Sequence, residues 1–68
     1  MMNKRETIKD FYGKIIGFVE TDNQGNKRVT DRYGRYCGTY YKRLNQTKNR
    51  YGRIVAIGDN IGLLLTAQ

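Results

Sequence analysis

The sequence has no histidine and no serine, and its 68 residues include one cysteine and six acidic residues. Hydrolytic triads need a general base, most often histidine, and Cys37 has no imidazole partner that could activate its thiol. A lone cysteine forms no intrachain disulfide, and scattered carboxylates without histidine do not match the ligand set of a structural zinc. We therefore predict that the protein is not an enzyme and holds no metal or other cofactor.

Long apolar runs are also absent. No stretch approaches the roughly 20 apolar residues of a membrane-spanning helix, and residues 1–11 carry charge without the apolar core of a secretory signal. One unpaired cysteine fits a reducing compartment. A chain of this length makes one domain and buries only about 60% of its unfolded surface. We expect a single cytoplasmic domain over residues 1–68, without a membrane role, whose thin core is supported by homo-oligomerisation.

A short pattern occurs three times in the chain, at residues 10–17, 31–38 and 49–56. It consists of Asp or Asn, any residue, Tyr, Gly, a basic residue, two further residues and a small residue. The recurrence indicates internal repetition. An Asp or Asn side chain accepts hydrogen bonds from nearby backbone N–H groups, and Gly supplies the positive φ of a tight turn. Each copy therefore predicts a hairpin turn followed by a strand.

The small residue that ends each copy is Gly17, Gly38 or Ala56. A small residue inside a strand marks a bulge, a sharp bend or the close approach of another backbone. A ligand that contacts bare backbone is the alternative, and the apolar neighbours of each position favour packing. Regular alternation of strand residues places this column on one face with the column two residues earlier, which contains Ile15, Tyr36 and Ile54.

These patterns predict an all-β fold of six short strands in consecutive antiparallel hairpins. The three repeated hairpin units would form a pseudo-threefold arrangement. The longer strands contain nearly continuous apolar runs, such as residues 15–19, which indicates burial on both faces against a neighbouring unit or subunit. The shorter strands are polar, and we expect them at the rim.

Residues 59–68 break the repeat. Asp59 suits the N-cap of a helix, and Ile61, Leu64 and Leu65 follow at helical spacing. We predict a short C-terminal helix that caps the open end of the hairpins. A final strand is the alternative, and in both cases the leucine run must be buried.

The net charge of +7 is unevenly distributed. Residues 27–53 contain nine basic residues and one acidic residue, whereas residues 1–26 balance four basic against four acidic residues. Basic residues interleaved with aromatic rings are typical of nucleic-acid-binding surfaces, where cations contact phosphates and rings stack on bases. Tyr33 and Tyr51 lie within the same segment. The predicted polyanion-binding residues are Arg32, Arg35, Tyr40, Tyr41, Lys42, Arg43, Lys48, Arg50 and Arg53.

Two functions fit this surface. The first is a binding module whose basic, tyrosine-bearing face contacts nucleic acid or another polyanion. The alternative is a structural or interaction protein that assembles with itself or binds a protein partner and has no nucleic-acid role. In that case the charges blunt sheet edges, and Tyr12, Tyr33 and Tyr51 pack beside their turns. Tyr12 has neutral surroundings, which weighs against a binding role repeated at every turn.

The repeated unit resembles a known type of protein. The resemblance depends on three triplets, each followed after two further residues by Gly17, Gly38 or Ala56. The triplets are Tyr12-Gly13-Lys14, Tyr33-Gly34-Arg35 and Tyr51-Gly52-Arg53. The unit resembles small bacterial proteins of the β-flower type, in which short hairpins with glycine-marked turns surround an axis like petals. The resemblance covers residues 10–59. It implies an all-β repeat fold of bacterial or phage type and carries over no catalytic or binding residue. The concentrated positive charge, and three units where four or five are usual, depart from that family.

Overall fold

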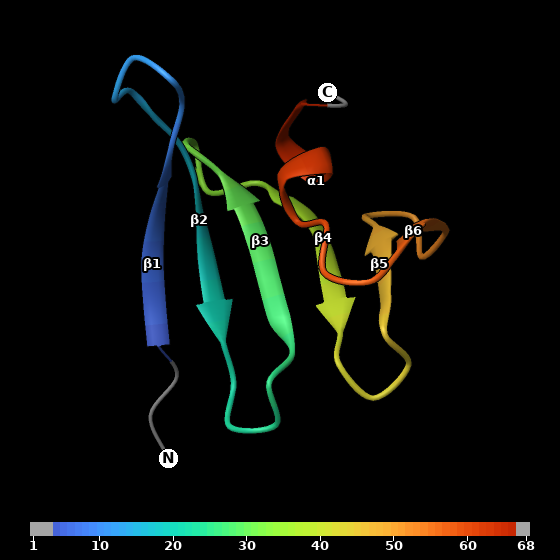
Figure 1. Ribbon diagram of the computed structural model, residues 1–68. Helices are drawn as coiled ribbons and strands as arrows, with labels where there is room; N and C mark the ends of the chain where they lie inside the picture. Colours follow the sequence, from blue (N-terminus) through green and yellow to red (C-terminus); the bar gives the residue numbers. More distant parts are fainter. Residues whose placement is uncertain (1–3, 67–68) are drawn as a thin grey trace.

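The computed structural model describes residues 4–66, which form one antiparallel sheet of six strands and a short helix (Figure 1). Each strand pairs with the next strand along the chain. The elements are β1 (Lys4–Lys9), β2 (Ile15–Thr21), β3 (Lys27–Asp31), β4 (Tyr36–Tyr41), β5 (Gln46–Asn49), β6 (Ile54–Ile57) and α1 (Gly62–Thr66). The predicted all-β class and the short C-terminal helix are confirmed. Residues 67–68 of the predicted cap lie outside the described residues.

The three predicted turns make the same hydrogen bonds. Asp10, Asp31 and Asn49 each donate their backbone N–H to the carbonyl oxygen four residues later, and each carbonyl accepts from the glycine three residues later. Each side-chain Oδ1 also accepts from the N–H groups two and four residues later, and all these distances lie between 2.8 and 3.0 Å. The φ angles of Gly13, Gly34 and Gly52 are 80°, 84° and 81°. The predicted turn geometry is therefore confirmed.

A fourth turn, between β2 and β3, has the same geometry. Asp22 Oδ1 accepts from the N–H groups of Gln24 and Asn26, both at 2.9 Å, and its carbonyl accepts from Gly25. Gly25 has a φ of 87°. This turn contains no tyrosine and no basic residue. The frame of Asp or Asn, two residues and Gly is thus sufficient to form the turn.

A bulge follows each of the three tyrosine-bearing turns. The register shifts where β1 meets β2, β3 meets β4 and β5 meets β6, so that Ile16, Cys37 and Val55 are extra residues without a direct partner. A small residue indicates a bulge, a bend or a close approach, and the structure shows a bulge directly before each of the three small residues. Such a bulge also increases the local twist of the sheet.

The bulges change which side chains share a face. Cys37, rather than Tyr36, lies on the face of Gly38, because Cys37 is buried in the core beside Leu64. Tyr36 lies on the opposite face, where its hydroxyl is hydrogen-bonded to Thr39. The prediction that the Tyr36 column shares a face with the small column is wrong, because the extra residue reverses the alternation.

The helix packs on one face of the sheet, against β4. The core between the sheet and the helix contains Val19, Val29 and Cys37 from the strands and Leu64 from α1. A Cβ atom on Gly38 would lie 2.3 Å from the carbonyl oxygen of Lys48 and 2.8 Å from Leu64 Cδ2. Gly17 is similarly close to the carbonyl of Thr30 and to Leu65. The glycines therefore let both a neighbouring strand and the helix approach the backbone. Ala56 belongs to edge strand β6, which has no further strand beside it.

Three details of the fold differ from the sequence-based predictions. The helix covers a face rather than the open end, and no second layer covers the opposite face within residues 4–66. The short strands β3 and β5 lie inside the sheet and supply its fully buried side chains, Val29 and Thr47. Asp59 lies three residues before the start of α1, and its carboxylate accepts a hydrogen bond from Lys27 Nζ instead of capping the helix.

We expect Gly38→Ala to lower the free energy of unfolding by about 3 kcal/mol or more, because its methyl group would overlap the Lys48 carbonyl and Leu64. Gly34→Ala should cost only about 1–2 kcal/mol, from its positive φ alone, since the space around it is open. Gly62→Ala, which meets no neighbour, is the control and should not destabilise the protein. Chemical denaturation measures the three values. Equal losses for Gly38→Ala and Gly34→Ala would contradict the packing described above.

Candidate nucleic-acid interface

The three tyrosine-bearing turns lie at the same end of the sheet. In a sheet whose strands follow one another in order, successive turns alternate between its two ends, so the β1–β2, β3–β4 and β5–β6 turns share one end. In Figure 1 the β2–β3 and β4–β5 turns lie together at the bottom, away from them. We call residues 10–14, 31–35 and 49–53 the turn end.

The tyrosines of the turn end point into solvent. Tyr12 is 88% exposed, Tyr33 66% and Tyr51 73%. Phe11 is also exposed, and its ring meets Tyr12 edge to face at 5.5 Å. The tyrosines are therefore not part of the core, and the contacts of their rings are with side chains of their own turns. Their exposed rings are available to another molecule.

Guanidinium groups lie over two of these rings. Arg32 and Arg35 lie 4.8 and 5.2 Å from the centroid of the Tyr33 ring, and Arg50 lies 5.0 Å from that of Tyr51. Such contacts contribute about 0.5–1 kcal/mol at exposed sites. They hold a cation over an aromatic ring in both turns, and cations and rings are the groups that contact phosphates and bases in single-stranded nucleic-acid binding.

Most of the cations at the turn end are not neutralised by a neighbour. Arg35 Nε donates to Asp31 Oδ2 at 2.7 Å. Arg32, Arg50 and Arg53 are exposed and have no carboxylate within ion-pair distance among residues 4–66. The turn end therefore presents positive charge that is not paired with carboxylates of the described residues.

The carboxylate of Asp31 accepts hydrogen bonds from backbone N–H groups of its own turn. Burial is the largest single influence and raises its pKa, but hydrogen bonds from the backbone N–H and side chain of Arg35 and from the N–H of Tyr33 together outweigh it. The net pKa lies below the ordinary value of 3.8. The pKa of Asp22 is also lowered, chiefly by the hydrogen bond from the Asn26 N–H. Both side chains are thus held as anions that bind the backbone.

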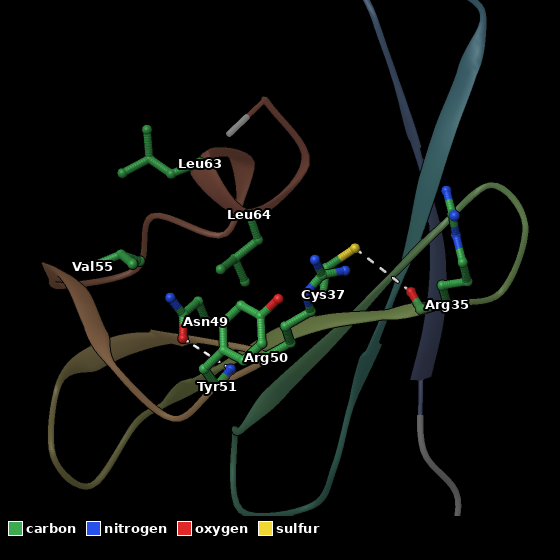
Figure 2. Close-up of a pocket in the computed structure, with 8 residues that line it drawn as sticks. All are labelled: Arg35, Cys37, Asn49, Arg50, Tyr51, Val55, Leu63 and Leu64. Carbon is green, nitrogen blue, oxygen red and sulfur yellow. Dashed lines mark hydrogen bonds between the residues drawn. The ribbon is translucent and has the colours of Figure 1, made fainter. Parts of the chain in front are cut away.

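A half-open pocket of about 610 Å³ lies beside the turn end, between the β3–β4 turn, the β5–β6 turn and α1 (Figure 2). Cys37 and Leu64 supply apolar surface, while Arg35, Arg50 and Tyr51 add cations and a ring. In Figure 2, Arg35 lies on one side of the pocket, and Val55 and Leu63 lie on the other. Apolar walls beside cations suit a flat group that carries negative charge.

The nine residues predicted from sequence do not form one surface. Four lie at the turn end, namely Arg32, Arg35, Arg50 and Arg53. Tyr41 and Lys48 lie on the face opposite α1, with Lys48 Nζ 5.4 Å from the centre of the Tyr41 ring. Lys42 and Arg43 lie in the β4–β5 turn at the other end of the sheet.

Tyr40 does not fit a binding surface. Its side chain is buried, and its hydroxyl donates to Asn45 Oδ1 at 2.9 Å. Of the two adjacent tyrosines, Tyr41 is the one that faces away from the core. We therefore leave Tyr40 out of the candidate interface. Conversely, the predicted set omitted Tyr33 and Tyr51, as well as Phe11, Tyr12 and Lys14, although the repeat places Tyr12 and Lys14 at positions equivalent to Tyr33 and Arg35.

The face opposite α1 is a second aromatic surface. Arg5 lies over the ring of Phe18 at 4.5 Å, and Arg28 lies over that of Tyr36 at 4.9 Å. These rings are half-buried beneath their cations, and the hollow beside Tyr36 is also lined by Glu20 and Asp22. Carboxylates repel a polyanion, so this face suits phosphate less well than the turn end.

Other kinds of site find no support in the described part of the chain. Residues 4–66 contain no group of three His, Cys, Asp or Glu side chains that could hold a metal ion. None of the helical structure in the same range is long and apolar enough to cross a membrane.

Comparisons with known proteins return no match. No family model, no curated protein and no solved structure is similar to this chain at a significant level. The resemblance to β-flower proteins thus depends on the repeated motifs alone. The function is argued below from the geometry of the turn end.

The lowered pKa of Asp31 predicts an acid-sensitive turn. A depressed folded-state pKa stabilises the fold above the ordinary value of 3.8, and this stability is lost as the pH falls through the folded-state value. Asp31→Asn keeps the Oδ1 acceptor, as Asn49 does in the third turn, but removes the charge. We expect thermal melts of Asp31→Asn to depend less on pH below about 4 than wild-type melts. Asp31→Ala should be destabilised at every pH, and an unchanged acid profile in Asp31→Asn would contradict this account.

Proposed function

We propose that the protein is a small non-enzymatic binding module whose turn end contacts a polyanion such as nucleic acid. One internal comparison carries this proposal. The β2–β3 turn makes the same hydrogen bonds with Gln24 and Asn26 at the positions where the other turns have tyrosine and a basic residue. The turn therefore does not require these residues, and their exposure shows that the core does not require them either.

The same observations support a repeat. We infer that the hairpins β1–β2, β3–β4 and β5–β6 are copies of one unit in a pseudo-threefold arrangement, as in β-flower proteins of bacterial or phage type. The shared turn geometry and the shared bulge support this inference. A repeated unit would present the same ring and cation at regular intervals along one end of the sheet. Such a row suits a ligand that is itself a repeating chain of charges.

In the proposed complex the cations contact phosphates and the rings stack on bases. Arg32, Arg50 and Arg53 would supply most of the charge, because the Asp31 carboxylate already pairs with Arg35. Tyr33 and Tyr51 would supply stacking faces, which accept any base. Alternate strands of a sheet lie about 9–10 Å apart, so neighbouring tyrosine-bearing turns would contact different parts of one strand. The proposal therefore favours single-stranded nucleic acid bound without sequence specificity.

Binding to a labelled single-stranded oligonucleotide should weaken steeply with salt. Four phosphate contacts give a slope of about −2.8 in a plot of log affinity against log salt concentration, so a fourfold rise in salt should weaken binding about 50-fold. Arg32→Gln combined with Arg50→Gln should reduce the steepness of that slope by about 1.4. Fluorescence anisotropy at several salt concentrations measures both values.

The matched control for that variant is Lys42→Gln combined with Arg43→Gln, which removes the same charge from the other end of the sheet. It should leave the slope nearly unchanged. Equal effects of the two double variants would show binding by net charge alone. An absence of binding at low salt would overturn the proposal and leave the alternative, a structural or interaction protein without a nucleic-acid role.

Stacking makes a separate prediction for the tyrosines. Tyr33→Ala and Tyr51→Ala should each weaken oligonucleotide binding by about 1–3 kcal/mol, because each removes a ring on which a base would stack. Their melting temperatures should match the wild type, since both side chains are exposed. Tyr33→Phe, which keeps the ring, should bind like the wild type. Full affinity in Tyr33→Ala would show that the ring does not contact the ligand.

A further inference from the structure

The two edges of the sheet differ in chemistry. Strands β1 and β6 form the edges, and an edge strand presents unpaired N–H and C=O groups that can pair with another chain. Four of the six residues of β1 are charged, which is a common protection against such pairing. Strand β6 reads Ile-Val-Ala-Ile and carries no charge. The β6 edge thus lacks the charges that protect the β1 edge, although the Ile57 carbonyl already accepts a hydrogen bond from Asn60 Nδ2 at 3.0 Å.

The side chains of β6 are exposed as well as apolar. Ile54 is 52% exposed, Val55 44% and Ile57 67%. Leu63 of α1 is also exposed and lines the same pocket wall as Val55. We call these four residues the β6 patch, of which Val55 and Leu63 lie on the face that carries α1 and Ile54 and Ile57, paired with Lys48 and Gln46, lie on the opposite face. Burial in the core does not explain the patch, because its side chains are exposed, and Ile54 and Ile57 are not among the residues that line the pocket beside the turn end.

We propose that β6 pairs in antiparallel fashion with β6 of a second copy of this chain, which gives a two-fold symmetric dimer. The two sheets of six strands would then form one continuous sheet of twelve. Antiparallel extension about a two-fold axis keeps the helix-bearing faces of both copies on the same side of the sheet. Val55 and Leu63 would therefore meet the same residues of the partner across the axis, and the β6 patch would be self-complementary.

The charges that flank β6 favour this orientation. Arg53 precedes the strand, and Asp59, whose carboxylate already accepts from Lys27 Nζ, follows it by two residues. Antiparallel pairing places the Arg53 end of one copy beside the Asp59 end of the other. Parallel pairing would instead bring the two Arg53 side chains together. Pairing of β6 with β1 would set an uncharged strand against a charged one, and it would leave edges free for open-ended growth.

The dimer should be reversible and dependent on concentration. A strand of four residues buries less than the roughly 800 Å² per partner of a standard stable interface. The antiparallel arrangement would direct the turn ends of the two copies to opposite ends of the joined sheet. The inference does not depend on polyanion binding, since its test contains no nucleic acid.

Analytical ultracentrifugation of the full chain over a range of concentrations tests the dimer. The wild type should show a monomer–dimer equilibrium, and Ile57→Lys should be monomeric at the same concentrations. The matched control is Leu44→Lys, which changes an exposed apolar residue in the β4–β5 turn and should dimerise like the wild type. Thermal melts should establish that each variant is folded. A wild type that stays monomeric, or an equal loss in Leu44→Lys, would overturn the proposal.

Cross-linking tests the mode of pairing. Val55 lies mid-strand, so in the proposed dimer it comes close to Val55 of the second copy, within reach of a disulfide. Val55→Cys should give a covalent dimer on mild oxidation, whereas Leu44→Cys and the wild type with its buried Cys37 should not. A dimer without this cross-link would show that another surface is used. A monomer that instead binds extended peptides through β6 would equally overturn self-pairing.

Discussion

The structure depends on one interaction, the capture of two backbone N–H groups by the side-chain oxygen of an Asp or Asn at the start of a turn. Asp10, Asp22, Asp31 and Asn49 each make this contact, and a glycine with positive φ completes each turn. The turn reverses the chain within five residues and fixes the register of the next strand. A small protein without disulfides thereby obtains a sheet mainly from local contacts. The residues between the Asp or Asn and the glycine are then free to serve another purpose.

Different residues therefore form the fold and form the surfaces that we propose for binding. The buried core is small and lies between the sheet, which supplies Val29, and one short helix, which supplies Leu64. The exposed tyrosines and most of the cations of the turn end contribute little to this core. The β6 patch is likewise exposed. We therefore propose that the turn end contacts a polyanion and that the β6 edge contacts a second copy. Both surfaces are exposed, and the core does not depend on them.

Much of the fold could be predicted from the sequence because its signals are local. The turns, the strands and the C-terminal helix follow from motif spacing and from the apolar pattern. Gly17 and Gly38 indicated a bulge only as one of three possibilities. Its effect on the faces could not be predicted, because one extra residue reverses the alternation and exchanges Tyr36 with Cys37. The residues of the proposed interface were more difficult to predict from the sequence than the fold. Arg35 and Lys42 are close in sequence, yet strand β4 carries them to opposite ends of the sheet. A continuous run of charge in the sequence is therefore not a continuous surface.

The most direct test of the account is an NMR titration of the protein with a single-stranded oligonucleotide at low salt. The account predicts that the largest amide shift changes fall in residues 10–14, 31–35 and 49–53, and that residues 22–26 and 42–45 change little. The β2–β3 turn is the decisive comparison, since it has the same backbone geometry without the rings and cations. Changes of equal size at both ends of the sheet, or none at the tyrosine-bearing turns, would contradict the assignment of the turn end as the binding surface.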